Sequence, residues 1–328
     1  MRPGASSAAS ESDAIPRSAL KPKPILVGFD PNNADRAPVR FAIAASRFTG
    51  APLIIGSVHA DSVVVGQMGH GRMDDEISLD AARPLEHLKI ELTSAGVEAH
   101  FTLLGGWSAP SGLHRGAEEF DAGLLVVGST NRGRLNRVLP GSTAERLMHG
   151  APCPVAVVPS GWQAGGGLKK IGVAFADTPE GNEALDSALA LAGRAGAKLR
   201  ILTAVKEKDF GRAAGGQAGH EATSYDTAGA TREQLDVDLA ALAAQRAPGV
   251  EVEVDVSVQD AAEFLVAASE HVDLLVIGSR GYGPRRAVLL GGVSRKVTAA
   301  AHSPVIVLAR GAESGLVQLI GEGATATA

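Results

Sequence analysis

The chain contains almost no cysteine and no apolar run long enough to cross a bilayer. Cys153 is the single cysteine among 328 residues, which excludes intrachain disulfides and metal sites built from several thiolates. It lies between two prolines at the start of an expected strand, so we expect a packing role for it and not a nucleophilic one. No stretch approaches the ~20 apolar residues of a membrane-spanning helix, and residues 1–20 lack the apolar core of a signal peptide. We therefore expect a cytoplasmic protein without a membrane partner.

A large excess of one charge is also absent. The chain has 31 Lys and Arg residues against 36 Asp and Glu residues, a net charge of −5. This balance does not favour nucleic acid as a partner, so any basic site must be local. Apolar residues make up 45% of the chain and charged residues 20%, which is typical of globular proteins. At about 150 residues per domain, the length indicates two domains.

What the sequence does contain is an internal repeat. Residues 124–143 read LLVVGSTNRGRLNRVLPGST and residues 274–293 read LLVIGSRGYGPRRAVLLGGV. Gly128 thus corresponds to Gly278, and Gly141 to Gly291. In both copies an apolar run ends in Gly-Ser, a basic loop follows, and a glycine opens a helical stretch. Backbone amides at such a helix start form a favourable site for anions.

Each half alternates short apolar strands with helical segments. The strands are expected at 25–29, 52–58, 97–104, 124–128 and 154–159, and again at 171–175, 199–205, 250–258, 274–278 and 304–309. Helices are expected between them, in the first half at 31–50, 75–95, 108–120 and 142–150. This alternation predicts an α/β fold with two doubly wound, five-stranded parallel sheets in tandem.

The domain boundaries follow from composition. We expect domains at 21–160 and 168–310, a flexible linker at 161–167, a mobile loop at 206–230, and tails at 1–20 and 311–328. Ligands of parallel sheets bind outside the carboxyl ends of the strands, so Asp30 and the loop after Gly128 are expected to share one crevice.

These motifs resemble those of the universal stress protein family, and the chain resembles a tandem member from residue 24 to residue 310. ATP-binding members carry an Asp at the end of the first strand and G-x2-G-x9-G-[ST] after the fourth. The resemblance implies Rossmann-like, adenine α-hydrolase-like domains. It also implies a stress-response module that binds ATP, alone or with Mg²⁺, as a ligand-dependent switch.

In the first half, the resemblance implies a complete set of nucleotide-binding positions with one change. Asn131 occupies the second glycine position, and asparagine tolerates the same left-handed backbone. Two alternatives stay open: Asp30 could form an Asx turn or cap a helix, and Ser142 with Glu145 could form a capping box. The implied first-half residues are Asp30, Val58, Gly128, Asn131, Arg132, Gly141, Ser142 and Thr143.

In the second half, Gly278, Gly281 and Gly291 match the motif, but Gly292 stands where the family has Ser or Thr. The phosphate-binding hydroxyl is lost there unless Ser294 replaces it. Ala176 aligns with Asp30, and Asp177 comes one residue late. Because a lost hydrogen bond to a charged group costs more than the change to asparagine, we expect the first half to bind ATP more tightly.

Six arginines add positive charge to the two loops and match phosphate geometry, although they could instead form a solvated face. They are Arg132, Arg134, Arg137, Arg280, Arg285 and Arg286. The chain lacks G-x4-G-K-[ST] and G-x-S-x-G, which excludes a P-loop hydrolase and a G-x-S-x-G enzyme. No candidate general base is placed for hydrolysis, so we expect no enzyme, with slow ATP hydrolysis left open. The alternatives are a nucleotide-free interaction scaffold and an adenine α-hydrolase-like enzyme, whose S-G-G-x-D-S loop is absent after Phe29.

The last strand of each half is apolar and would leave an exposed edge if unpaired. The family resemblance implies that these strands pair, so the halves are expected to dock as a pseudo-dimer within one chain. A homodimer and an unidentified protein partner are left open.

Overall fold

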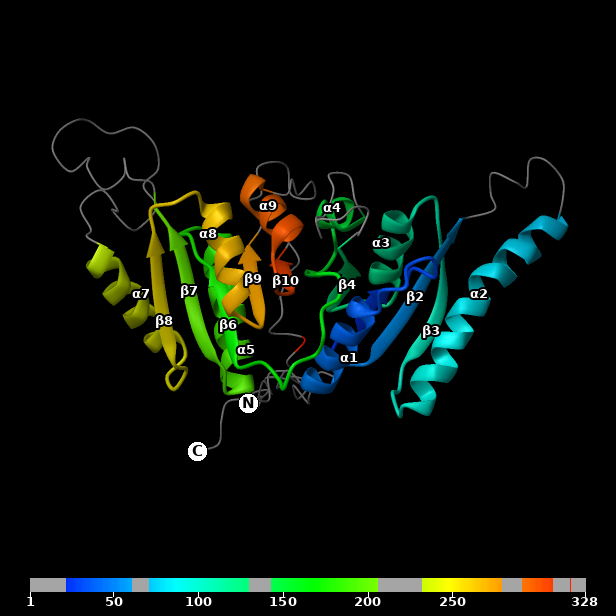
Figure 1. Ribbon diagram of the computed structural model, residues 1–328, viewed down its shortest axis with the longest axis horizontal. Helices are drawn as coiled ribbons and strands as arrows, with labels where there is room; N and C mark the ends of the chain where they lie inside the picture. The colour runs from blue at the N-terminus through cyan, green and yellow to red at the C-terminus, as the bar shows by residue number, and fades with distance from the viewer. Residues whose placement is uncertain are drawn as a thin grey trace, which may run out of the picture.

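The computed structural model describes residues 22–60, 71–129, 143–205, 232–278, 291–308 and 319. The chain runs through two successive β/α series (Figure 1). The first consists of β1 (Ile25–Gly28), α1 (Ala37–Thr49), β2 (Leu53–Ala60), α2 (Gly71–Ser94), β3 (His100–Gly106), α3 (Ala109–Glu119), β4 (Leu124–Gly128), α4 (Thr143–Met148) and β5 (Val155–Val158). The second consists of β6 (Lys170–Ala174), α5 (Pro179–Ala195), β7 (Lys198–Ala204), α7 (Arg232–Arg246), β8 (Val252–Ser257), α8 (Ala261–Ala268), the 3₁₀ turn η3 (Ser269–His271), β9 (Leu274–Gly278), α9 (Gly292–Ala300) and β10 (Val305–Leu308).

All the described strands belong to one ten-stranded sheet, in the order β3-β2-β1-β4-β5-β10-β9-β6-β7-β8. Within each half the strands are parallel, and the order is that of a doubly wound fold. The halves meet where β10 pairs antiparallel with β5, with Ile306 opposite Ala156. The predicted fold class and the predicted pairing of the last strands are therefore confirmed.

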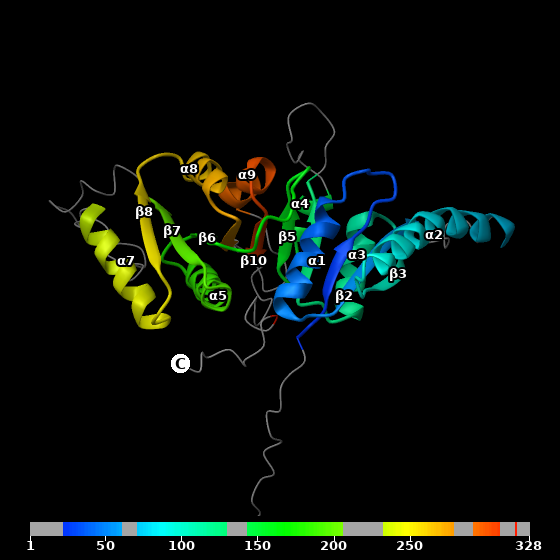
Figure 2. The same ribbon diagram turned by 60° about the horizontal axis from the view of Figure 1, so that its bottom comes forward.

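Two hydrophobic layers cover the sheet, and both run through the two halves. Alternation along a strand sends Ile25 and Val27 into one layer and Leu26 into the other. The first layer is covered by α1, α2, α5 and α7, and the second by α3, α4, α8 and α9; Figure 2 shows α1 and α5 on one face with α8 and α9 on the other. Each fully buried Val, Leu, Ile or Phe side chain contributes about 1.5–3 kcal/mol to folding stability. Because both layers contain such side chains from the two halves, they hold the halves together.

The first helix begins later than the sequence predicts. The helix α1 starts at Ala37 and not at residue 31, although it stops at Gly50 in the left-handed conformation (φ 73°), as expected. The amide of Asn32 donates to Asp30 Oδ1 (2.9 Å), that of Asp35 to Asn33 Oδ1 (3.0 Å) and that of Ala37 to Asp35 Oδ1 (2.9 Å). These local side-chain bonds compete with helical ones and hold the segment in turns.

The predicted linker is held at both of its ends. The Trp162 carbonyl accepts hydrogen bonds from Arg40 Nε (3.2 Å) and Nη2 (3.0 Å), and the Gly161 amide donates to Asp35 Oδ2 (3.0 Å). Just beyond the linker, the Lys169 amide donates to Asp273 Oδ2 (2.8 Å).

The segment predicted as a C-terminal tail contributes one residue to the core. Leu319 is 2% exposed, and its side chain packs against Gly123. The predicted N-terminal tail and the predicted mobile loop lie outside the described residues.

Candidate nucleotide-binding site

The predicted first-half residues that the structure describes lie along one edge of the sheet. Gly28 of β1 pairs with Gly56 of β2, and Val27 pairs with Val126 of β4. Continuing this register past the end of β1 places Asp30 beside Val58, with Gly128 of β4 one residue short of the level of Asp30. Thr143 is the first residue of α4. The register therefore brings Asp30, Val58 and Gly128 together. Asn131, Arg132, Gly141 and Ser142 lie outside the described residues, as do the other loop arginines.

Local contacts explain part of this first-half pattern without a ligand. Asp30 is exposed and forms the Asx turn with Asn32 that the sequence left open. A Cβ at Gly128 would lie 2.9 Å from Pro38 Cγ, so glycine lets α1 pack closely on the end of β4. Val58 packs in the same way against Gly112 of α3. A nucleotide-binding role for these residues stays a prediction.

The second half contains a pocket of about 680 Å³ at the carboxyl ends of β6, β7 and β9. Gly278, Gly291 and Ser294, three of the residues predicted from the sequence, line it. Gly281 lies outside the described residues. Apolar residues form much of the remaining wall, among them Phe175, Leu202, Val258, Leu265 and Ile277.

Three helices begin at this pocket. The residues that precede their first turns, Thr178 before α5, Asp260 before α8 and Gly291 before α9, all line it. Helix N-termini carry partial positive charge and unpaired amides, so they favour anions. The Lys296 side chain also lines the pocket, with Nζ 4.0 Å from Asp260 Oδ1. The glycine spacing gives no indication of Thr178, Asp260 or Lys296, although a polar capping residue shortly after a strand end is a detectable signal.

The start of α9 is the part of the pocket best suited to an anion. The first helical hydrogen bond runs from the Arg295 amide to the Gly291 carbonyl (3.0 Å), so the amides of residues 292–294 are not used inside the helix. The Ser294 hydroxyl is buried and donates to the Gly278 carbonyl (3.2 Å). Since a hydroxyl has one proton to donate, Ser294 does not supply the missing phosphate donor while this bond is intact.

Gly278 and the displaced acid have structural roles in this half. A Cβ at Gly278 would lie 2.6 Å from the Glu180 carbonyl oxygen, so α5 packs tightly on the end of β9. Asp177 accepts a hydrogen bond from Asn182 Nδ2 (3.3 Å) and is not among the residues that line the pocket, whereas Ala176 is. The shift of the acid by one residue therefore turns it from the pocket toward α5.

Cys153 is 3% exposed, and burial raises the pKa of its thiol to about 12, so the thiol is protonated at neutral pH. Among the residues described, no group of three or more His, Cys, Asp or Glu side chains could hold a metal ion. Nor does that part of the chain contain a helix of the length and apolarity needed to cross a membrane.

Comparison with known proteins agrees with this arrangement. The model of the universal stress protein family matches residues 21–159 and 167–309. The chain belongs to the universal stress protein family. Universal stress protein Rv2319c of Mycobacterium tuberculosis H37Rv is 26% identical over 297 residues, which cover 87% of this chain and 99% of that protein. Universal stress protein Rv2623 of the same strain is 28% identical over 308 residues, which cover 86% and 95%.

A solved structure shows the same fold. The crystal structure of a universal stress protein from Archaeoglobus fulgidus DSM 4304 aligns with a TM-score of 0.64 and 19% identity, over 87% of this chain and 96% of that one. Both the sequence relatives and this structure extend over most of the present chain, so the tandem arrangement of universal stress protein domains is shared.

Proposed function

We propose that this universal stress protein is an ATP-binding stress-response module, in which ATP is a regulatory ligand and not a rapidly consumed substrate. The observation that carries the proposal is the pocket of about 680 Å³ lined by Gly278, Gly291 and Ser294. Its volume lies within the roughly 300–1,000 Å³ of typical ligand sites. The glycine spacing of the sequence also predicts an anion site at this strand end.

The pocket offers distinct surroundings for the two ends of a nucleotide. Phosphate groups would lie at the start of α9, where backbone amides and Lys296 provide positive potential. The nucleoside would lie against the apolar wall near Leu202 and Val258. The space beside Gly292 is open, because no heavy atom of the described residues lies within 4 Å of the position that a Cβ would take there.

The same helix connects the pocket to the junction between the halves. Arg295 of α9 lies with Nη1 3.9 Å from Oε1 of Glu145 on α4. An anion that orders the first turn of α9 would therefore favour one position of α9 against α4. This contact is the route by which bound ATP would change the surface that a protein partner meets.

Titration calorimetry of ATP into the full chain tests the proposal. We expect saturable binding that includes the second-half site, and Lys296→Ala should weaken ATP at that site about three- to tenfold, more at low salt than at high salt. The matched control is Lys89→Ala, because Lys89 is also an exposed helical lysine beside a carboxylate, here Glu86 (3.3 Å), but lies on α2. The control should bind like the parent. Absence of ATP binding would favour the nucleotide-free scaffold, and equal effects of the two variants would refute binding at α9.

A further inference from the structure

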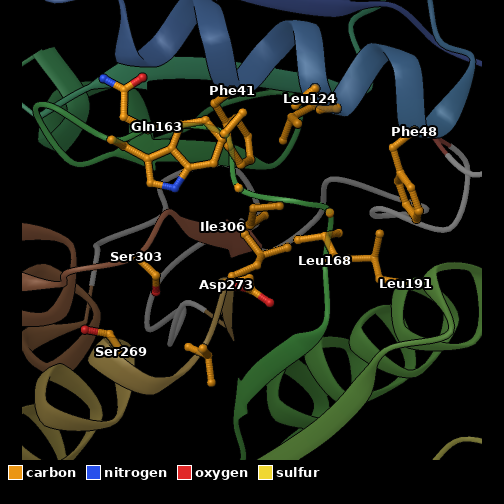
Figure 3. A pocket seen from close by; sticks show the side chains of 18 of the residues that line it. Phe41, Phe48, Leu124, Gln163, Leu168, Leu191, Ser269, Asp273, Ser303 and Ile306 are labelled. Atoms are coloured by element: carbon orange, nitrogen blue, oxygen red, sulfur yellow. The ribbon is translucent and has the colours of Figure 1, made fainter.

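We infer that a second ligand site lies between the two halves, and that it takes a small neutral molecule with an apolar body and one hydroxyl group. The site is a cavity of about 320 Å³ beside α1, the linker and β10 (Figure 3). It touches the residues that precede β9 and β10, at the opposite ends of the second-half strands from the nucleotide pocket. It is therefore independent of the proposed ATP site.

The walls of the cavity are mainly apolar, and both halves supply them. Phe41 and Phe48 point into it from α1, and Leu191 and Ile306 come from the second half (Figure 3). Trp162 of the linker packs edge-on against Phe41, with ring centroids 5.5 Å apart. Because Arg40 holds the Trp162 carbonyl, the linker forms a fixed wall of the site. The cavity therefore forms only where the two halves are docked against each other.

One polar group in the cavity has an unmet hydrogen-bonding capacity. Ser303 lies just before β10 and is 5% exposed, yet its Oγ has no hydrogen-bond partner among the residues that the structure describes. Ser303 lines the cavity, opposite the aromatic rings in Figure 3. A buried hydroxyl without a partner is unfavourable, and native proteins usually satisfy such groups. The Oγ atom is fully buried in the present rotamer, so the Ser303 side chain must turn toward the cavity, where a ligand hydroxyl can both donate to and accept from it.

The charges at the rim select against an anionic ligand. Asp273 and Glu270 both line the cavity, so a carboxylate there would meet like charge. Neither carboxylate needs a cationic ligand, because each already has a partner in the protein. Asp273 Oδ2 accepts the amides of Lys169 and Lys170 (2.8 Å each), and Glu270 Oε1 lies 3.3 Å from His302 Nε2. A volume near the lower end of the range for ligand sites points to a medium-chain alcohol or a compound of similar size.

Tryptophan fluorescence offers a direct test. The chain has 2 tryptophans, and Trp107 is 71% exposed, so Trp107→Phe leaves Trp162 as the single reporter in the cavity wall. In that background we expect 8-bromo-1-octanol to quench Trp162 emission saturably through its bromine atom. We expect 8-bromooctanoate to bind at least about fivefold more weakly because of the acidic rim. Failure of the alcohol to saturate, or equal binding of the carboxylate, would overturn the inference.

Two further variants, made in the same background, locate the probe. Ser303→Ala should weaken 8-bromo-1-octanol about three- to tenfold without lowering the melting temperature, since its hydroxyl has no partner to lose. Ser57→Ala is the matched control, because Ser57 Oγ is also buried and unpartnered among the described residues but lies in β2, away from the cavity. Ala44→Leu, which fills the cavity from α1, should abolish quenching while ATP binding is retained. Unchanged quenching in Ser303→Ala and Ala44→Leu would place the probe elsewhere and refute the site.

Discussion

Restoring the hydroxyl that the second half lacks should strengthen ATP binding. Gly292 is the first residue of α9 and lines the proposed nucleotide pocket, with no heavy atom of the described residues within 4 Å of a Cβ position. Gly292→Ser therefore adds a donor at the helix start without a steric cost from these residues. A hydrogen bond to a charged group is worth about 1.5–3 kcal/mol, so the dissociation constant for ATP should fall by about tenfold or more.

The control for this prediction is Gly292→Ala, which changes the backbone preference in the same direction but adds no hydroxyl. Both substitutions remove the flexibility of glycine at the helix start, so they should alter folding stability similarly. Calorimetry on the full-length parent and both variants, at one fixed salt concentration, separates the two effects. If the serine and alanine variants bind ATP equally, the hydroxyl does not meet the phosphates and the assignment of α9 as the phosphate site is wrong.

Three further predictions concern ionisable groups. Burial raises the pKa of Asp35, but hydrogen bonds from the amides of Ala37 and Gly161 and from the Ser160 side chain, together with the charge of Arg40, lower it by more, so its net pKa lies below the usual range. Asp35→Ala should therefore reduce the free energy of unfolding by about 1 kcal/mol at pH 7, and urea titrations should show this difference shrinking as the pH falls through the lowered pKa. Burial, Glu180 and Asp186 raise the pKa of Glu183, so Glu183→Gln should raise the urea midpoint at pH 7 and lose this advantage below about pH 4. Cys153 should react with a thiol reagent only in urea that unfolds the chain; fast labelling in native buffer would contradict its burial.

The strands were predictable because each is a short apolar run between turn-forming residues. The expected strands at 124–128 and 274–278 coincide with β4 and β9. The start of α1 was not predictable from apolar spacing, because Asp30, Asn33 and Asp35 hold the preceding segment in turns. The burial of Leu319 was not predicted either, because the apolar group Leu316, Val317, Leu319 and Ile320 is too short to show a helical or strand period. The burial of Leu319 depends on tertiary packing.

Only the part of the candidate site that belongs to the glycine motif could be predicted from the sequence. The spacing identified Gly278, Gly291 and Ser294, which line one pocket. It missed Thr178 and Asp260, which cap the starts of α5 and α8, because their place beside the pocket depends on the strand order. It also gave Ser294 as a substitute phosphate donor, whereas the structure uses that hydroxyl to hold the Gly278 carbonyl. The expectation that the first half binds ATP more tightly stays a prediction.

Binding of ATP at the carboxyl end of the second-half sheet can be followed residue by residue with an amide-resolved titration. Full-length protein labelled with ¹⁵N is titrated with ATP while backbone amide signals are followed by NMR. We expect saturable shifts at Gly278, Gly291, Gly292 and Ser294, which line the pocket, with little change at Gln163 and Leu168, which do not line it. Saturable shifts confined to other residues, or no saturable shift at any ATP concentration tested, would contradict it.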